Sequence, residues 1–431
     1  MLAYKLESTN DLLTSNAGLL SLGHLIEHIG LINRIDTLFP KPGSNRGYVA
    51  SSFALPLIYN LHLGGDCLDD VLQLESDRCL CRLLGIKKIP KPCSIGDWLR
   101  RHGTVGLQAC SILLRDSVKI GLGRCSTVTL DIDATFCRSS HQEAHYSYLG
   151  DKGYMPIVGT IAESSQMIAI DFRKGNCPPS AGNLDFIHHC QQMLPEGVSL
   201  KAVRIDAAGY QYKILDYLIE QQVEFAIRAK MSGSLKQAIQ DIKPSSWHCD
   251  ANNPHQELAK MVHSMHDSQH AFEVVVQRIA IQDQLSIEFD DDCETEEFSC
   301  GRYLYRAIAT NSKRNNKDLI DWYNQRADDA ENRIRDFKSD FGASKPPCKD
   351  FGASALYLTL CALAHNLFVL LKLVLPPKLH SGRIKKIRFK IYNIAGKLTR
   401  HARQFILKVP KQFVKMFNDI KDNLAQLPII T

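Results

Sequence analysis

The sequence lacks several features that would place it in a specialised class. Its fourteen cysteines are scattered and do not form the regular framework of a small disulfide-bonded secreted protein. The nearest approach to a metal motif is Cys79-Leu80-Cys81, with Cys67 and Cys93 at a distance, and a C-x-C without a matching pair is a weak zinc signal. The first ten residues, MLAYKLESTN, show no basic segment followed by an apolar core, so we expect no signal peptide. These absences favour a cytosolic protein with buried, reduced thiols.

Only one apolar run is long enough to cross a bilayer, and it covers residues 354–375. His365, Asn366 and Lys372 interrupt this run, and polar groups are costly at the centre of a membrane. We therefore predict a buried core helix and no membrane partner.

Charge is distributed unevenly along the 431 residues. The formal net charge is +6, but the segment from Lys372 to the end holds fourteen Lys or Arg and two Asp or Glu, which gives +12 and leaves −6 for the rest. A basic tail of this kind is typical of a protein that binds a polyanion such as DNA. The alternative is a solvated surface that binds nothing.

The pattern of apolar residues changes near residue 126. Before it, apolar residues recur at helical spacing, and one predicted helix, SIGDWLRRHG, begins at Ser94 and ends at Gly103. After it, TVTLDIDATF, YMPIVGTIAE and QMIAIDFRKG predict an antiparallel meander, and the following segments complete the order βββαβαβ. This order is that of a ribonuclease-H-like mixed α/β sheet, with its first and fourth strands side by side.

The segments after this core predict further parts. HAFEVVVQRIAI and RYLYRAIATN indicate a pair of strands in a β-rich insertion, and the acidic run between them, EFDDDCETEEF, is typical of a solvated loop. We predict five parts: a helical N-terminal domain for DNA binding or dimerisation (1–125), the first part of the catalytic core (126–230), the β-rich insertion (231–311), the second part of the core (312–375) and a basic C-terminal DNA-contacting region (376–431).

Three acidic residues stand at the ends of predicted strands. Asp131 and Asp133 point to the same side of their strand because side chains alternate, and Asp133 is closer to the strand end. Asp206 ends the fourth strand, which the predicted order places beside the first. Taken alone, each acid is more commonly a cap or turn residue.

A predicted helix from Trp322 to Lys338 supplies the remaining candidates. At 100° per residue, Tyr323, Ala330, Ile334 and Phe337 form a buried stripe with Arg326 at its margin, and Glu331 and Lys338 share the other margin. If Glu331 joins Asp133 and Asp206, the three carboxylates repel one another unless a cation neutralises them. Mg²⁺ or Mn²⁺ prefers such oxygen ligands, and two ions suit an in-line attack at phosphorus.

These residues resemble the signature of DDE-type bacterial insertion-sequence transposases, in the branch with a β-rich insertion. That branch has the pattern Tyr-x2-Arg-x3-Glu-x6-Lys. Tyr323, Arg326, Glu331 and Lys338 follow it, except that four residues instead of three separate Arg326 from Glu331. DIDAT resembles the strand of the first acid and favours Asp133, and RIDAAGY resembles the strand of the second.

The resemblance implies that Asp133, Asp206 and Glu331 are the catalytic and metal-binding residues of an enzyme that cuts terminal inverted repeats and joins them to target DNA. It also implies a homodimer in a synaptic complex, a cytoplasmic and nucleoid-associated location, and aromatic residues that stack on a base, for which Trp247 and Trp322 are candidates. We expect Lys397, Arg400 and Arg403 to lie at helical spacing in KLTRHARQF. The predicted DNA contacts are Tyr323, Arg326, Lys338, Arg383, Lys385, Lys386, Arg388, Lys390, Arg400 and Arg403.

Two other functions remain open from the residues. A ribonuclease-H-like nuclease would hydrolyse DNA without joining strands. A non-catalytic DNA-binding protein could use the same scaffold, although the three acids Asp133, Asp206 and Glu331 argue against this hypothesis.

Overall fold

The computed structural model of the protein describes residues 2–44, 47–148, 150–250, 253–281 and 296–430, without the side chains of 250, 254 and 327–332. Its internal contacts divide the chain into two compact units. The first comprises Met1–Gly123, Cys137–His145 and Arg335–Thr431, and the second comprises Arg124–Phe136 and Tyr146–Ile334. The acidic run predicted between the two strands of the insertion lies largely outside the described residues.

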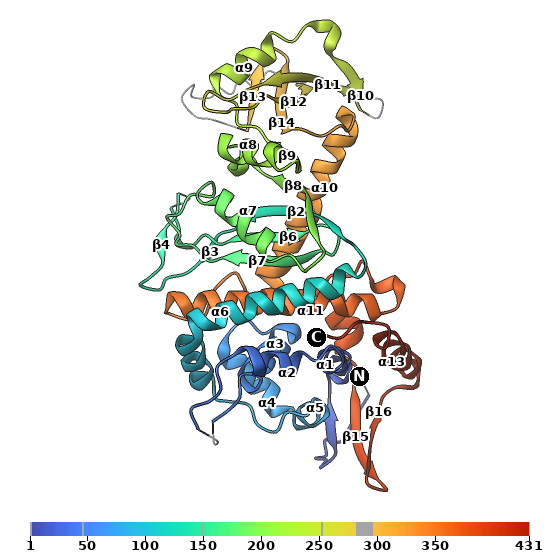
Figure 1. Ribbon diagram of the computed structural model, residues 1–431. Coiled ribbons are helices and arrows are strands. Elements are labelled where there is room, and N and C mark those ends of the chain that lie inside the picture. Colours follow the sequence, from blue (N-terminus) through green and yellow to red (C-terminus); the bar gives the residue numbers. More distant parts are fainter. Residues whose placement is uncertain (1, 45–46, 149, 251–252, 282–295, 431) are drawn as a thin grey trace. The chain divides into compact units, whose positions relative to one another are not determined.

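The second unit is built on a mixed sheet whose central part has the predicted strand order (Figure 1). Three strands form the antiparallel meander, the fourth pairs in parallel with the first, and the fifth pairs in parallel with the fourth. In chain order the elements are β2 (Thr127–Ala134), β6 (Ile157–Ile161), β7 (Gln166–Asp171), α7 (Asn183–Gln192), β8 (Ser199–Ile205), α8 (Tyr212–Glu220) and β9 (Glu224–Arg228). This is a ribonuclease-H-like core, and the predicted fold class is confirmed.

The strands of the β-rich segment continue the same sheet. Strand β14 pairs with β9 on one side and with β12 and β13 on the other, so the order across this end is β10-β11-β12-β14-β9. The predicted pairing of HAFEVVVQRIAI with RYLYRAIATN is confirmed by the antiparallel register of β12 and β14. The elements are α9 (Gly233–Gln240), β10 (His248–Asp250), β11 (Asn253–His263), β12 (Phe272–Ala280), β13 (Glu297–Cys300) and β14 (Tyr303–Thr310).

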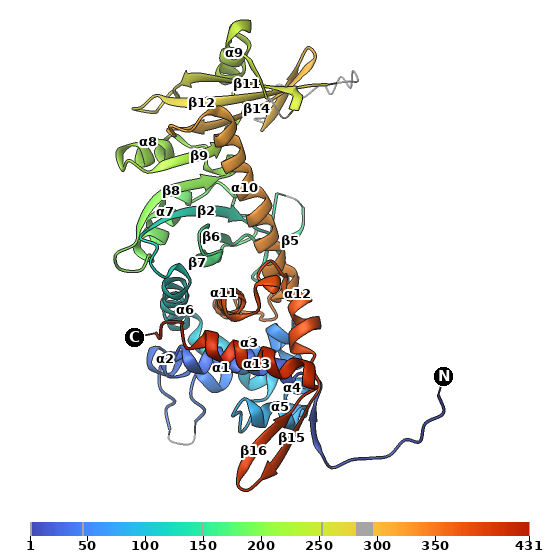
Figure 2. The ribbon, with the colours of Figure 1, turned by 90° about the vertical axis from the view of Figure 1, so that its right-hand side faces the viewer.

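Helices cover the two faces of the central strands (Figure 2). Leu130 and Gly159 face α7, because a Cβ built on Gly159 would lie 2.6 Å from Sγ of Cys190. The opposite face carries Asp131 and Arg204, and α10 (Asn316–Arg335) lies over it, since Arg204 donates a hydrogen bond to the Trp322 carbonyl. The acids of β2 therefore face α10.

The first unit consists mainly of helices packed around one apolar helix, α11 (Phe351–Val374). α11 is the only helix in the described part of the chain that is long and apolar enough to cross a membrane, and its apolar window is entirely buried. It packs against α6 (Pro92–Leu122) and α3 (Ser51–Leu63), in accord with the predicted core helix. The other helices are α1 (Leu20–His28), α2 (Leu31–Leu38), α4 (Val71–Ser76), α5 (Arg78–Leu83), α12 (Ile384–Ile387) and α13 (Lys411–Leu424).

The predicted end of a helix at Gly103 is wrong, because α6 continues through this residue to Leu122. Gly103 serves instead as a crossing point for α11. A Cβ on Gly103 would lie 2.9 Å from the carbonyl carbon of Gly352, so the absence of a side chain allows the two helices to approach closely.

The C-terminal segment also differs from the prediction. KLTRHARQF is not helical but forms most of an antiparallel hairpin between β15 (Gly396–His401) and β16 (Gln404–Lys408), with β15 also paired to β1 (Leu12–Thr14). The alternation that specifies a strand is present, since Leu398 is buried and pairs with Leu407 while its neighbours are more exposed. Three short strands lie between β2 and β6: β3 (Cys137–Arg138), β4 (His145–Tyr146) and β5 (Lys152–Tyr154).

Candidate active site

Two carboxylates stand side by side at the ends of adjacent parallel strands. The register pairs Ile132 of β2 with Ile205 of β8, so the next residues along each strand, Asp133 and Asp206, are neighbours. Adjacent strands lie about 4.8 Å apart, and residues in register point to the same face. Asp206 begins a short 3-10 helix (Ala207–Gly209) and accepts a hydrogen bond of 3.0 Å from the Ala208 amide. The first two predicted acids therefore come together as expected from the strand order.

Asp131 lies on the same face but is committed to the fold. Its two oxygens accept hydrogen bonds of 2.7 and 2.9 Å from Nε and Nη2 of Arg204, and Arg333 Nη1 lies 3.3 Å from Oδ2. All three side chains are buried. Two guanidinium groups thus neutralise Asp131 and leave it little capacity to bind a further cation. The side chain of Asp133, by contrast, is 30% exposed.

Arg326 is built into the floor of this site. Its Nη2 donates a hydrogen bond of 2.9 Å to the carbonyl oxygen of Ile132 and lies 3.6 Å from Oδ1 of Asp133. Burial alone would lower the pKa of Arg326, but its electrostatic interactions with Tyr323 and with the carboxylates of Asp133 and Asp206 outweigh burial and raise it. The guanidinium therefore stays charged beside the two carboxylates. Only 7% of the residue is exposed to solvent, so it offers little surface to a DNA phosphate.

Tyr323 is also an interior residue. It packs in a core cluster with Leu319, Ile320 and Val275, and the guanidinium of Arg228 lies 5.5 Å from its ring centre. Burial raises the pKa of its hydroxyl, so the phenol stays neutral. In this structure Tyr323 supports α10 against the sheet rather than presenting a surface to DNA.

The remaining two members of the predicted signature are placed differently. Glu331 belongs to α10, and its side chain lies outside the described residues. The prediction that one α-helix extends to Lys338 is wrong, because α10 ends at Arg335 and Asp336–Asp340 form a π-helical turn. A π turn has more residues per turn than an α-helix, so the helical periodicity used in the prediction ends at Arg335. Lys338 itself is half-buried in the first unit.

An open cleft of about 410 Å³ borders Asp206. Its walls include the exposed Tyr148, the loop around Pro178, and the charged side chains of Lys230 and Glu296. Asp133 lies near the end of β2, Asp206 directly follows β8 and Lys230 follows β9, so the three residues lie at the same edge of three successive parallel strands. Ligands commonly bind at this edge, beyond the carboxyl ends of parallel strands.

The predicted DNA-contacting residues of the tail fall into two groups. Arg383 and Lys385 bind the carboxylate of Asp340, at 3.2 and 3.3 Å, and Arg388 donates hydrogen bonds to the carbonyl oxygens of Leu61, His62 and Asp340. These three cations stabilise the first unit. The other predicted contacts are exposed, and they are Lys386, Lys390, Arg400 and Arg403.

Both candidate stacking tryptophans already contact arginine. The guanidinium of Arg278 lies 4.0 Å from the ring centre of Trp247, which is buried. Trp322 is half-buried, with the guanidinium groups of Arg204 and Arg314 at 5.3 and 4.5 Å from its ring centre. Cation–π contacts of this kind hold the rings within the second unit.

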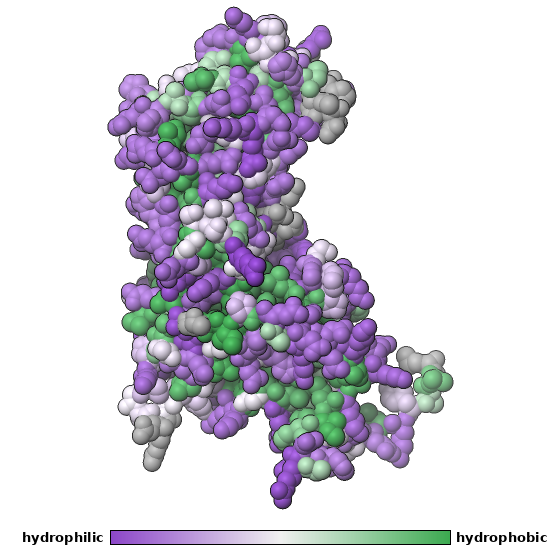
Figure 3. Space-filling model, turned by 45° about the vertical axis from the view of Figure 1, so that its right-hand side comes forward, coloured by the Kyte–Doolittle hydropathy of each residue, from purple (hydrophilic) through white to green (hydrophobic). Residues whose placement is uncertain are grey.

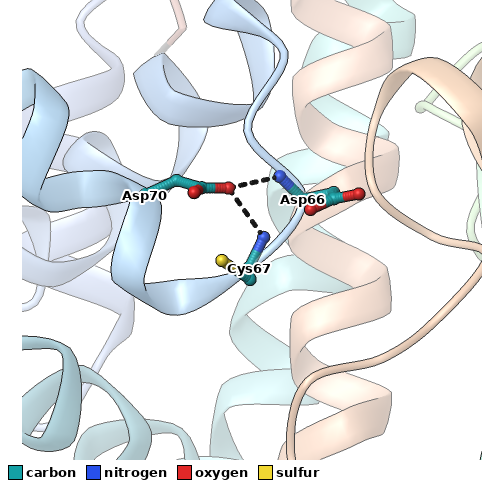
Figure 4. Close-up of side chains that lie close together, drawn as sticks. All are labelled: Asp66, Cys67 and Asp70. Carbon is teal, nitrogen blue, oxygen red and sulfur yellow. Dashed lines mark hydrogen bonds between the residues drawn. The ribbon is translucent and has the colours of Figure 1, made fainter.

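One other group has the size of a metal site among the described residues, namely Asp66, Cys67 and Asp70 (Figure 4). The carboxylate of Asp70 accepts hydrogen bonds of 2.9 and 3.1 Å from the amides of Asp66 and Cys67. Burial alone would raise the pKa of Asp70, but these hydrogen bonds outweigh burial and lower it. The group is therefore a capped turn before a 3-10 helix, and Cys79 and Cys81 take no part in it.

The sequence reasoning missed three residues of this site. They are Arg204 and Arg333, which enclose Asp131, and Lys230, which lines the cleft. A signal was present for each: Arg204 lies two residues before Asp206 and so shares its face, Arg333 is seven residues from Arg326 on the helix, and Lys230 follows the fifth strand.

Comparison with known proteins gives one family match. The family model described as "Transposase DDE domain group 1" matches residues 5–429. A cryo-EM structure of the piggyBac transposase synaptic complex with hairpin DNA is similar over 86% of this chain and 78% of that chain, with 11% sequence identity and a TM-score of 0.47. A search among curated proteins finds no match.

Proposed function

Because the chain belongs to the family of group 1 DDE-domain transposases, we propose that it cuts DNA at the terminal inverted repeats of a bacterial insertion sequence and joins the ends to a target. The observation that carries the proposal is the pairing of Asp133 with Asp206 at one edge of the ribonuclease-H-like sheet. Asp131, the alternative first acid, is enclosed by Arg204 and Arg333.

The described donors suit a divalent cation of the kind that such transposases use. Two adjacent carboxylates repel each other, and hard oxygen ligands favour Mg²⁺ or Mn²⁺. We assign Asp133, Asp206 and the Glu331 of α10 to this metal site, with two ions as the expected number. When bound, the cations would polarise the scissile phosphate and lower the pKa of the attacking hydroxyl.

The rest of the site holds these acids in place. The Asp131–Arg204 pair links β2 to β8, and Arg333 links the same carboxylate to α10. Arg326 fixes the end of β2 through the carbonyl of Ile132. These buried contacts preorganise the two strand ends, so the carboxylates need little rearrangement when the substrate arrives.

The DNA strand enters, in this proposal, through the cleft beside Asp206. Lys230 is a half-buried cation on the wall of this cleft and is suited to a phosphate oxygen. Tyr148 is 71% exposed and offers a ring on which a base can stack. The exposed Lys386 and Lys390 supply phosphate contacts outside the site. In this proposal the enzyme works as a homodimer in the cytoplasm, associated with the nucleoid.

The test is a strand-transfer assay with purified full-length protein, Mg²⁺, a supercoiled target plasmid and labelled DNA from both borders of the coding sequence. Joined products are expected for the wild type and should fall at least a thousandfold for Asp133→Asn and Asp206→Asn, because each loses a metal ligand. Asp171→Asn is the matched control, since Asp171 is an exposed carboxylate at the end of β7 in the same sheet.

Three outcomes separate the possible functions. Joined products that depend on Asp133 and Asp206 support a transposase. Nicks without joined products would indicate a nuclease, and DNA binding without any cleavage would indicate a non-catalytic protein.

A further inference from the structure

The hairpin of β15 and β16 is a basic ribbon that extends from the helices of the first unit (Figure 2). Arg400, Arg403 and Lys408 are exposed, and residues 396–408 contain no carboxylate. Lys397 is the one hairpin cation with a carboxylate partner among the described residues, at 2.6 Å from Asp11. In Figure 3 the tip of this hairpin, at the lower end of the view, is hydrophilic.

The tip turns through two residues that both adopt a left-handed backbone. His401 pairs with Gln404, and the two residues between them, Ala402 and Arg403, have φ of 46° and 64°. Tight hairpin turns of this geometry favour Asn-Gly, and a left-handed residue with a Cβ costs about 1 kcal/mol. The turn therefore presents an arginine at its apex despite a backbone preference for glycine.

Phe405 ties this hairpin to an N-terminal helix that is more than three hundred residues away in the sequence. Its ring is 58% exposed, and the guanidinium groups of Arg82 and Arg400 each lie 5.9 Å from the ring centre. Arg82 belongs to α5, and α5 contacts β1, the strand that pairs with β15. The hairpin and α5 are thus neighbours within one unit.

The surface of α5 beside the hairpin is itself hollow and basic. An open cleft of about 550 Å³ is lined by the side chains of Arg78, Arg82, Lys87 and Lys88, with Glu75 as its one carboxylate. All four cations are exposed. Four positive charges against one negative charge make a local excess of three, next to a hairpin that adds Arg400 and Arg403.

We infer that this composite surface, formed by the α5 cleft and the β15–β16 hairpin, binds double-stranded DNA. The inference rests on the proposed function and assigns it a duplex-binding surface made from both ends of the chain. A two-stranded ribbon fits the major groove of B-DNA, and Arg400 and Arg403 then contact phosphates along the edges of this groove. The cations of the cleft contact phosphates on the strand that borders this groove.

Duplex binding is measured by fluorescence anisotropy with a 30-base-pair DNA of random sequence, at several salt concentrations. The variants are Lys87→Ala/Lys88→Ala for the cleft and Arg400→Ala/Arg403→Ala for the hairpin. The control is Lys411→Ala/Lys415→Ala, which removes two exposed charges from α13 of the same unit. Because the substituted side chains are exposed, the melting temperature of each variant should match that of the wild type.

The cleft variant and the hairpin variant should each weaken duplex binding by roughly tenfold at 150 mM salt. Each should also lower the slope of log Kd against log salt by about 1.8, since each lost phosphate contact contributes about 0.9. The variant that combines all four substitutions should lower the slope by about twice as much. The control should leave both quantities unchanged.

The proposal is overturned if the cleft variant or the hairpin variant has the wild-type slope of log Kd against log salt. It is also overturned if the control variant weakens binding as much as these variants do. Stronger binding of a single strand than of the duplex also overturns it. The binding assay needs no catalysis, so it can support the duplex-binding surface even if strand transfer fails. Conversely, if strand transfer succeeds but these variants bind DNA like the wild type, only the duplex-binding surface is refuted.

Discussion

Replacement of Asp131 by asparagine should lower the stability of the protein, whereas the same replacement at Asp133 should abolish DNA joining and leave the stability nearly unchanged. Asp131→Asn removes the charge that compensates Arg204 and Arg333, and all three side chains are buried. Loss of one partner from a buried ion pair costs about 3–5 kcal/mol. For a unit of about 200 residues, this corresponds to a fall in Tm of roughly 6–20 °C.

Asp133→Asn removes a carboxylate that is partly exposed and lies beside Asp206. Arg326, whose Nη2 lies 3.6 Å from Oδ1 of Asp133, keeps its hydrogen bond to the Ile132 carbonyl. We therefore expect a change in the free energy of unfolding below about 1 kcal/mol, because a partly exposed ion pair contributes little and the repulsion from Asp206 is relieved. DNA joining should nevertheless be lost.

The assay combines differential scanning calorimetry of both variants with strand transfer at 25 °C, below either melting transition. The expected pattern is a destabilised Asp131→Asn and an inactive, stable Asp133→Asn. If Asp131→Asn melts with the wild type and is inactive, while Asp133→Asn remains active, the assignment of roles to the two aspartates is refuted.

Three further predictions follow from buried groups. Burial lowers the pKa of His62 to about 3, so the free energy of unfolding falls by up to about 1.4 kcal/mol per pH unit as the pH drops below about 6.5. The variant His62→Gln should reduce this pH dependence, measured by urea denaturation at a series of pH values. An unchanged pH dependence would contradict the prediction. Arg388→Ala should lower the free energy of unfolding by about 3 kcal/mol in urea because buried carbonyls lose their donor, while Lys390→Ala, the exposed control, should change it by less than about 0.5. Gly159→Ala should lower Tm through overpacking of about 1–3 kcal/mol against Cys190, and a wild-type Tm refutes this.

The neutral state of His62 follows from its two partners. Its Nε2 lies 3.0 Å from the carbonyl oxygen of Ala364, which can only accept, so this nitrogen carries the hydrogen. Its Nδ1, 2.9 Å from the hydroxyl of Tyr392, then accepts a hydrogen bond. A second proton on the ring would compete with the hydroxyl hydrogen in a fully buried site.

The order of the core strands could be predicted from the sequence because each strand has its own alternating pattern and short turns. The pattern could also place Asp133 near Asp206. Both Asp131 and Asp133 point to the same face, and the sequence favours Asp133 only through its place nearer the strand end and the form of DIDAT. The enclosure of Asp131 could not be predicted, because it depends on Arg204, which the parallel register sets directly opposite Asp131.

Two local features escaped prediction for physical reasons. The three-residue spacing of Lys397, Arg400 and Arg403 favours a helix. The hairpin depends instead on pairing between its two strands, such as Leu398 with Leu407. The π turn at Asp336–Asp340 has no signal in the apolar periodicity, so the end of α10 at Arg335 could not be predicted. Arg333 shares the side of α10 that carries Arg326, but no local pattern marks it as a partner of Asp131, which is about two hundred residues away in the sequence.

Replacement of the Asp206 carboxylate by a thiol tests most directly whether this residue holds the catalytic metal ion. Asp206→Cys replaces a hard oxygen with a softer sulfur, so strand transfer should be lost in Mg²⁺ and partly restored in Mn²⁺, which accepts sulfur more readily. Asp171→Cys should be active in both metals. If Asp206→Cys joins DNA as well as the wild type in Mg²⁺, or if Mn²⁺ restores nothing while the variant remains folded, Asp206 does not hold the metal and the central claim is wrong.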